Sequence, residues 1–370
     1  MKILINLIGG QPVPNYLAAK VIRPDKILNV CSKASESIMK RINITIQVET
    51  IEPSLLVDAF NFDENYNLIS NYLRNSDDEI IINITGGTKI MSIAAFEAAK
   101  QFNLKSVYVD SENHFLYSLI KGIVEKSKLE EKILIDDYFK LHGVSNSYEN
   151  RIDYSEDEIH QLKEFDKYIL DNPGFVSPVL ELTDKILQYK RRNKKKWLKE
   201  NIEIQKSQNR FEWKNGKGSI KYSIKGLQFV MHFENEKLLE YHNGKWFEKV
   251  VYGKLVESGN YDEVIMNYEI FNAEGDKINE LDIVAIKNEK LDIFECKSGG
   301  LFQEDLNKLK AIKDTLGKYS NLNLITYYRI NENTENERIV KQKLKDYNIK
   351  NYVYFRSNLN FGDDKSNTNL

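Results

Sequence analysis

The first part of the chain alternates short apolar runs with segments of helical pattern. The apolar runs predict strands, most of them buried on both faces, at Ile3–Ile8, Ile27–Cys31, Ile44–Val48, Ile80–Ile84 and Val107–Asp110. Helices are predicted between them at Ser35–Arg41, Pro53–Leu73 and Lys89–Phe102. Strands that alternate with helices indicate βαβ units and a mainly parallel sheet. Residues 1–145 are therefore expected to form a Rossmann-like α/β domain.

The last part, residues 234–370, predicts a second α/β domain with a different order of elements. It starts with a helix at Trp246–Glu257, whose apolar residues share one face. Three strands follow, then helix, strand, helix and strand. The predicted strands are Glu263–Asn272, Ile278–Lys287, Leu291–Lys297, Leu322–Tyr328 and Tyr352–Arg356, and the predicted helices are Gln303–Leu316 and Glu335–Lys345.

The middle, residues 146–233, is expected to be a connector made of a small helical module and a hairpin. Residues 150–206 are rich in charge and in helix formers, whereas Arg210–Trp213 and Ser219–Phe233 are strand-like and are separated by turn signals. The stretch Lys185–Lys199 carries lysines and arginines but no acidic residue. Lys194, Lys195 and Lys196 are candidate contacts for nucleic acid, and a solvated helix face explains them as well.

Composition narrows the class of protein. The 370 residues suffice for two or three domains, and 41% hydrophobic with 29% charged residues is typical of a soluble globular protein. A formal net charge of −2 gives no overall attraction to nucleic acid or to a membrane surface. Two cysteines, Cys31 and Cys296, exclude a disulfide framework and fit a cytoplasmic location. No apolar run approaches the ~20 residues of a membrane span, so no membrane partner is expected.

Two carboxylates and one lysine lie at neighbouring positions of two predicted strands. Asp282 belongs to the first strand and Glu295 and Lys297 to the second, and Asn288 and Glu289 between them suit a tight hairpin. Such a hairpin brings Asp282 beside Glu295, and Lys297 shares a strand face with Glu295. Neighbouring carboxylates repel each other unless a cation lies between them, and oxygen ligands suit Mg²⁺ or Mn²⁺. Because such an ion polarises a phosphodiester, these residues predict metal-dependent cleavage of nucleic acid.

This constellation resembles the PD-(D/E)xK nuclease motif, and the order of the surrounding elements matches the core of that fold. In this resemblance Asp282 takes the first acidic position, and Glu295 with Lys297 forms the E-x-K part. Glu248, on the preceding helix, matches a carboxylate that some members add to the metal shell. The resemblance thus implies that Asp282, Glu295 and Glu248 hold the metal and that Lys297 acts on the phosphate.

A second candidate site is a glycine turn between a buried strand and a helix. It reads Thr85-Gly86-Gly87-Thr88-Lys89, and its glycines let the backbone approach an anion closely. The helix after it offers free N–H groups and a positive dipole end. Neither a Walker A loop nor a dinucleotide fingerprint is present, so a capped strand-to-helix turn stays the alternative. The loop Gly9–Asn15 is expected at the same edge of the sheet, and His114, after another strand, is expected to be a water-contacting loop residue.

Together the two halves resemble the CARF-domain nucleases of type III CRISPR systems. The Thr-Gly-Gly-Thr-Lys turn in a Rossmann-like half joined to a PD-(D/E)xK domain carries this resemblance, and Leu134–Gly143 resembles the end of the CARF half. The resemblance implies that two CARF domains pair about a two-fold axis and bind a cyclic oligoadenylate that activates the nuclease, with tetra-adenylate as the expected ring. It assigns the ligand site to Gln11, Asn15, Thr85, Gly86, Gly87, Thr88, Lys89 and Met91.

The sequence therefore leads us to expect a cytoplasmic homodimer that, when activated, cleaves DNA or RNA with Mn²⁺ or Mg²⁺ and with little sequence specificity. One alternative is a constitutive DNA repair or restriction-type nuclease with a Rossmann-like dimerisation domain. Another is a ligand-gated transcription regulator in which Lys190–Lys199 binds DNA and the C-terminal domain is inert. The joint presence of Asp282, Glu295 and Lys297 argues against this last alternative.

Overall fold

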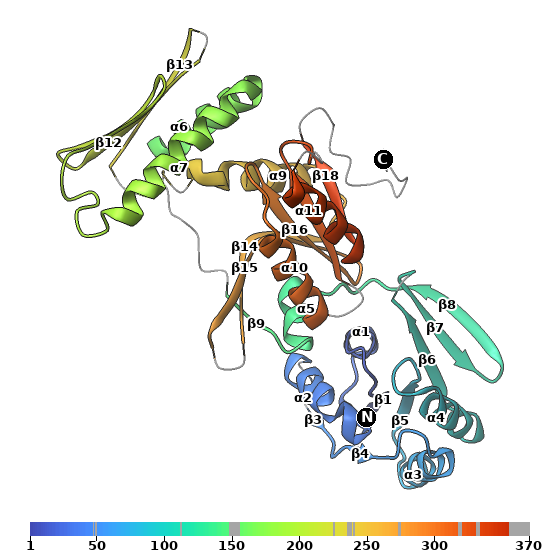
Figure 1. The fold of residues 1–370 in the computed structure, drawn as a ribbon. Coiled ribbons are helices and arrows are strands. Elements are labelled where there is room, and N and C mark those ends of the chain that lie inside the picture. The colour runs from blue at the N-terminus through green and yellow to red at the C-terminus, as the bar shows by residue number, and fades with distance from the viewer. Residues whose placement is uncertain are drawn as a thin grey trace.

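The structure is a computed structural model, and it describes residues 1–46, 48, 50–111, 113–147, 156–224, 226–234, 239, 241–272, 275–316, 320–330 and 334–354. Within these residues the chain forms three β-sheets, one in each of the N-terminal, middle and C-terminal parts (Figure 1). In the described residues no helix is long and apolar enough to cross a membrane.

The N-terminal sheet is parallel over most of its width and ends in an antiparallel hairpin. Its strands are β1 (Lys2–Leu7), β2 (Lys26–Cys31), β3 (Thr50–Ile51), β4 (Leu55–Leu56), β5 (Glu79–Asn83), β6 (Lys105–Asp110), β7 (Phe115–Ile120) and β8 (Ile123–Lys128). They follow the order β3-β2-β1-β5-β6-β7-β8, and β4 also pairs with β2. Pairing is parallel as far as β6 and antiparallel from β6 to β8. The mainly parallel sheet confirms the predicted fold class.

Helices cover both faces of this sheet. They are α1 (Val13–Ile22), α2 (Glu36–Thr45), α3 (Phe62–Arg74), α4 (Lys89–Gln101) and α5 (Ile135–Leu141), with a short 3-10 turn η1 (Lys33–Ser35). Leu4 of β1 packs in one core with α1, α2 and α5, whereas Ile3 and Ile5 pack with α3 and α4. Because both faces are covered, β1 and β2 are buried after their first residues, which explains their continuous apolar runs.

Several N-terminal elements differ from the prediction. The described part of Ile44–Val48 is the end of α2 and a bend rather than a strand, and the helix predicted from Pro53 begins only at Phe62. It begins there because the Asn61 side chain accepts a hydrogen bond from the backbone N–H of Glu64 and caps the helix. Helix α1 was not predicted, because Gly9–Asn15 was expected to be a loop; Pro12 instead precedes the helix and Pro14 lies in its first turn, where proline is tolerated. Strands β7 and β8 were not predicted either.

The middle part is more extensive than the predicted helices and hairpin. It contains α6 (Glu156–Asp171), the 3-10 turn η2 (Pro173–Phe175), α7 (Val176–Arg192) and an antiparallel sheet of β10 (Ile202–Lys206), β11 (Asn209–Lys214), β12 (Lys217–Ile224) and β13 (Leu227–Phe233). Phe165, Phe211 and Tyr222 belong to the same hydrophobic core as Phe247 and Ile283 of the C-terminal part. The middle part is therefore packed onto the C-terminal part and does not hang from it as a loose linker.

The C-terminal part follows the predicted order of elements. After a π-helical turn η3 (Tyr241–Lys245) come α9 (Trp246–Glu257), β14 (Glu263–Phe271), β15 (Lys277–Lys287), β16 (Lys290–Lys297), α10 (Gln303–Leu316), β17 (Ser320–Thr326), α11 (Glu335–Asp346) and β18 (Ile349–Val353). A short strand, β9 (Ser145–Ser147), adds to its edge, so that the sheet order is β18-β17-β16-β15-β14-β9. The end of the last predicted strand, at residues 355 and 356, lies outside the described residues.

Helix α5 joins the N-terminal part to the C-terminal sheet (Figure 1). The Tyr268 hydroxyl of β14 donates a hydrogen bond to the Asp136 carboxylate at 2.9 Å, and the backbone N–H of Ile135 donates to Glu263 at 2.7 Å. The rings of Phe139 and Tyr268 also pack against each other in a tilted arrangement, with centroids 4.7 Å apart. The division of the chain at residues 145 and 233 stays a prediction.

Candidate active site and ligand-binding edge

The three predicted catalytic residues lie where strands β15 and β16 part. Their antiparallel ladder ends at Ile283 opposite Phe294, and Asp282 and Glu295 are the next residues on the two strands. At this point the Asp282 carboxylate accepts a hydrogen bond of 2.7 Å from the backbone N–H of Cys296. This bond satisfies a donor that the ladder no longer pairs, and it holds the carboxylate beside Glu295. The predicted hairpin is confirmed, and Cys296 is buried.

Lys297 is held between two carboxylates. Its ammonium lies 2.7 Å from Glu295 Oε1 and 3.4 Å from Asp305 Oδ1. Burial opposes the charged form, but the negative charges of Glu295 and Asp282 outweigh it and raise the pKa of Lys297 above its usual range. The side chain therefore stays a cation in the neutral pH range.

Asp305 was missed by the sequence analysis. It belongs to the first turn of α10, where an acidic side chain also interacts favourably with the helix dipole. The available signal was its position just after the E-x-K strand, at the start of the next helix. It gives the Lys297 ammonium a second partner besides Glu295.

Glu248 of α9 adds a third carboxylate to the same buried region. Burial raises its pKa to about 7, Lys245 opposes this shift, and the charge of Glu295 adds to it. Burial likewise raises the pKa of Asp282 well above its usual range, and the charges of Glu295 and Glu248 add to that shift. The charge of Glu295 therefore disfavours the ionised forms of Asp282 and Glu248, and the Lys297 cation partly offsets this effect.

The predicted metal set does not form a finished metal site in this structure. In the part of the chain that the structure describes, no group of three or more His, Cys, Asp or Glu side chains is arranged to hold a metal ion. The Glu295 carboxylate contacts the Lys297 ammonium instead.

The glycine turn of the N-terminal part packs closely against the loop after β1. A Cβ atom on Gly86 would lie 1.9 Å from the carbonyl oxygen of Leu7, and one on Gly9 would lie 2.7 Å from the backbone nitrogen of Gly87. Only glycine leaves room for the two backbones at this distance. Both loops lie at the carboxyl ends of neighbouring parallel strands, the edge at which open α/β sheets bind ligands.

Buried amides hold these two loops together. The side chain of Asn15, which α1 carries, donates to the carbonyl of Leu7 at 3.1 Å and accepts from the side chain of Asn83 at 2.9 Å. The Thr85 hydroxyl donates to Asn83 at 2.6 Å and accepts from the backbone N–H of Val109 at 2.7 Å. Asn15 is fully buried, so in this structure it acts on the shape of the loops and presents no free surface.

The remaining predicted ligand residues divide into buried and accessible ones. The Thr88 hydroxyl accepts the backbone N–H of Met91 and thereby caps α4, and it donates to the carbonyl of Ala59. Met91 is buried beneath the turn. Lys89 is exposed at the start of α4, and Gln11 is half-buried in the neighbouring loop. A ligand at this edge would thus meet the backbone of the turn together with Lys89 and Gln11.

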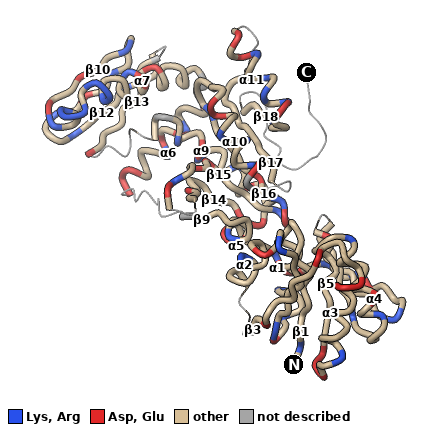
Figure 2. Tube along the Cα trace, turned by 60° about the horizontal axis from the view of Figure 1, so that its bottom comes forward, with Lys and Arg blue, Asp and Glu red and all other residues tan. Residues whose placement is uncertain are grey.

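The basic stretch of the connector lies at the end of α7, and Figure 2 shows the charges of this region. Lys194 and Lys195 are exposed, whereas Lys196 pairs with Glu200 at 3.3 Å. Trp197 is buried against Phe211, with ring centroids 6.0 Å apart. Trp197 therefore packs in the core of the middle part, and stacking on a nucleic-acid base is not available to it.

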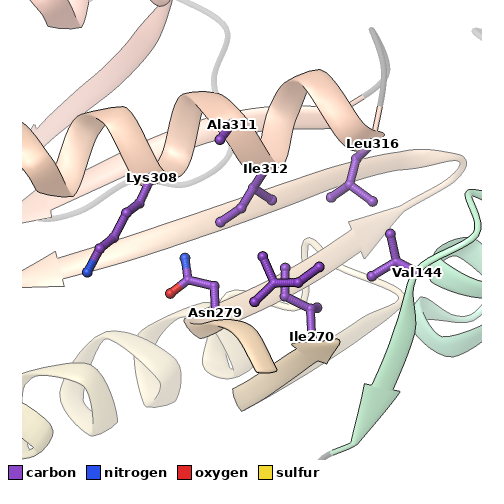
Figure 3. Close-up of a pocket in the computed structure, with 8 residues that line it drawn as sticks. Val144, Ile270, Asn279, Lys308, Ala311, Ile312 and Leu316 are labelled. Carbon is purple, nitrogen blue, oxygen red and sulfur yellow. The ribbon is translucent and has the colours of Figure 1, made fainter. Parts of the chain in front are cut away.

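An apolar pocket of about 220 Å³ lies between α10 and the strands β14 and β15 (Figure 3). Its lining consists of Val144, Ile270, Ile278, Asn279, Lys308, Ala311, Ile312 and Leu316. None of the predicted site residues belongs to this lining, so the pocket is separate from both candidate sites.

Comparison with known families matches each terminal part to a different domain. Residues 3–138 match the family described as "Card1 CARF domain", and residues 235–350 match the family described as "Card1-like, endonuclease domain". No curated protein matches this sequence.

Among solved structures, the chain is similar to protein VC1899 from Vibrio cholerae, with 17% identity and a TM-score of 0.74 over 95% of this chain and 94% of that chain. It is also similar to Can2 from Sulfobacillus thermosulfidooxidans in complex with cyclic tetra-adenylate, with 18% identity and a TM-score of 0.68 over 95% of both chains. A type III CRISPR defence DNA nuclease activated by cyclic oligoadenylate gives 17% identity and a TM-score of 0.52, covering 88% of this chain and 45% of that chain. At these identities the likeness shows a shared fold.

Proposed function

This chain belongs to the family that joins a Card1 CARF domain to a Card1-like endonuclease domain, and on this premise we propose that it is a nuclease activated by cyclic oligoadenylate in type III CRISPR defence. The observation that carries the proposal is the meeting of Asp282, Glu295 and Lys297 at one point of the endonuclease domain, in a chain that also has a CARF domain. The similarity to Can2 in complex with cyclic tetra-adenylate and to a type III CRISPR defence DNA nuclease activated by cyclic oligoadenylate supports this class of activator.

We assign the activator to the edge formed by the turn Thr85–Lys89 and the loop after β1. The half-buried turn leads into the start of α4, and the N-terminal end of a helix attracts phosphate; the exposed Lys89 adds a positive charge there. Cyclic tetra-adenylate is the proposed ring, bound by two CARF domains in a homodimer. Because Gly86 and Gly9 have no side chain, the turn and the loop after β1 pack closely together. This packing sets the shape of the edge, and no side chain at these two positions covers the backbone that the ligand would contact.

The acidic residues fit a hard divalent cation, Mn²⁺ or Mg²⁺. Asp282, Glu295 and Glu248 offer oxygen donors. Burial, with the charges of neighbouring acids adding to it, raises the pKa values of Asp282 and Glu248, and a bound cation would favour their ionised forms. When bound, the ion would polarise the scissile phosphodiester of DNA or RNA. The bond from Cys296 orients Asp282, and Lys297 keeps a positive charge where negative charge develops on the phosphate.

One assay tests this function directly. Plasmid DNA, single-stranded DNA and single-stranded RNA are incubated with the protein and Mn²⁺, with and without cyclic tetra-adenylate. We expect cleavage of at least one substrate that requires both the ligand and the metal, and EDTA should stop it. Equal cleavage without the ligand would instead indicate a constitutive nuclease, and no cleavage under any condition would contradict the assignment.

The exposed lysines after α7 are proposed to contact the phosphate backbone of the substrate. Changing Lys194, Lys195 and Lys196 to glutamate should raise the KM for substrate on the order of tenfold and flatten its salt dependence, because fewer counterions are released on binding. Activator affinity should stay the same, since these residues follow α7, which lies away from the N-terminal part in Figure 1. As a control for total charge, we suggest reversing Lys20, Lys40 and Lys100, which are exposed on CARF helices. The same KM and salt slope in wild type and the 194–196 variant would place this stretch outside the substrate path.

A further inference from the structure

The turn between β6 and β7 touches the turn of the hairpin that carries the catalytic residues. His114 Nδ1 and Glu289 Oε1 form a hydrogen bond of 3.0 Å across this junction. The side chains are only 9% and 4% exposed, so the expectation that His114 is a water-contacting loop residue is wrong. Residues far apart in the chain, one in the CARF domain and one in the endonuclease domain, thus share a buried polar contact.

On the CARF side, His114 is connected to the proposed activator turn through the end of β6. The hydroxyl of Thr85, a residue of that turn, accepts the backbone N–H of Val109 at 2.7 Å. The next residue, Asp110, accepts the backbone N–H of Asn113 at 3.1 Å and thereby holds the β6–β7 turn. A displacement of the activator turn would therefore act on the residues that carry His114.

On the endonuclease side, Glu289 is the turn residue of the catalytic hairpin. Strands β15 and β16 are paired without a break from Lys287 opposite Lys290 to Ile283 opposite Phe294, immediately before Asp282 and Glu295. Six residues of extended strand separate Glu289 from Glu295, or roughly 20 Å. A paired hairpin moves as one unit, so a shift at Glu289 would reach the position where the two carboxylates meet.

The buried His114–Glu289 pair fixes a particular geometry at this junction and does more than hold the two domains together. Burial raises the pKa of Glu289 to about 8, and the charges of Asp110 and Asp262 add to this shift, while burial lowers the pKa of His114. His114 also has a left-handed backbone, with φ of 62°. A buried polar pair and an unfavourable backbone angle cost free energy that an apolar contact would avoid, which indicates that the geometry itself matters here.

We infer that the His114–Glu289 contact couples the activator edge of the CARF domain to the catalytic hairpin, so that these two residues position Asp282 and Glu295 in response to the ligand. The inference rests on the proposed function and adds the route by which the ligand acts. His114 and Glu289 are positioning residues, because neither lies at the proposed metal or at the activator turn.

The test compares Glu289→Leu, Glu289→Gln and His114→Ala with wild type in three measurements: direct binding of cyclic tetra-adenylate, cleavage without it, and cleavage at saturating ligand. For Glu289→Leu and His114→Ala we expect the activation ratio to fall about tenfold, while cleavage without ligand and the melting temperature change little. Glu289→Gln should retain most of the activation, because its amide can still pair with His114. The double variant His114→Ala, Glu289→Leu should be no worse than either single variant.

An ion pair of the CARF domain outside this junction provides the control. Arg23 and Glu131 lie 2.8 Å apart, and Glu131→Gln should leave the activation ratio unchanged. An unchanged ratio in Glu289→Leu, or a loss of basal and activated cleavage in equal proportion with a lower melting temperature, would overturn the inference. If the wild type itself does not respond to the ligand, the proposed function fails first, so the two failures are distinguishable.

Discussion

Glu295→Gln and Asp282→Asn are each expected to lower the rate of activated cleavage by on the order of 10²–10³-fold or more. Both changes keep the shape of the side chain but remove a negative charge from the proposed cation site. Glu295→Gln also removes the carboxylate that lies 2.7 Å from the Lys297 ammonium. Of the two ion pairs of this ammonium, only the one with Asp305 then remains. The measurement is the single-turnover rate at saturating cyclic tetra-adenylate and Mn²⁺.

Stability and ligand binding separate a chemical effect from an unfolded variant. Asp282 is buried with a raised pKa, so replacing it by an uncharged amide should leave the melting temperature unchanged or higher. Binding of cyclic tetra-adenylate should match wild type for both variants. Glu304→Gln, an exposed change in the first turn of α10, is the matched control and should retain full activity. Wild-type cleavage by Glu295→Gln would remove the basis for the active-site assignment.

Gly86→Ala should abolish activation by cyclic oligoadenylate at ligand concentrations that saturate the wild type. The added Cβ would lie 1.9 Å from the Leu7 carbonyl oxygen, a backbone atom that cannot rotate away, so the turn must move from the loop after β1. Overpacking of this kind costs about 1–3 kcal/mol of stability and would also displace the backbone N–H groups that we assign to phosphate binding. The measurements are the binding isotherm for cyclic tetra-adenylate and the thermal unfolding curve.

Gly10→Ala is the control for this change. It lies on the same edge, but a Cβ there meets no atom within 4 Å and its φ is not positive, so binding and activation should stay close to wild type. If Gly86→Ala binds the ligand with unchanged affinity, the activator site lies elsewhere in the chain. If both variants lose binding, the effect belongs to the loop in general and not to the close approach at Gly86.

The C-terminal domain was the part most readable from sequence. Each of its strands and helices carries its own period of apolar residues, and the acids and lysine of the E-x-K pattern lie on two strands joined by a tight turn. The proximity of Asp282 and Glu295 could therefore be predicted from strand alternation and the tight turn alone. The glycine turn before α4 was predictable in the same way, because Gly86 and Gly87 join a buried strand directly to a helix.

The elements and contacts that the sequence did not predict depend on contacts between residues that are distant in the chain. Helix α1 and strands β7, β8 and β10 were not predicted. In the structure α1 packs in the core on one face of the N-terminal sheet, and the three strands pair within the sheets that they join. Asp305 meets Lys297, and Asn15 meets Asn83, only after the domains have folded. The buried pairing of His114 with Glu289, 175 residues apart, carries no local signal, since either residue alone is typical of an exposed turn. Local periodicity thus determined most elements of the C-terminal domain and the catalytic hairpin, whereas packing between distant segments, within a domain for Asn15 with Asn83 and between domains for His114 with Glu289, decided which polar groups became buried partners.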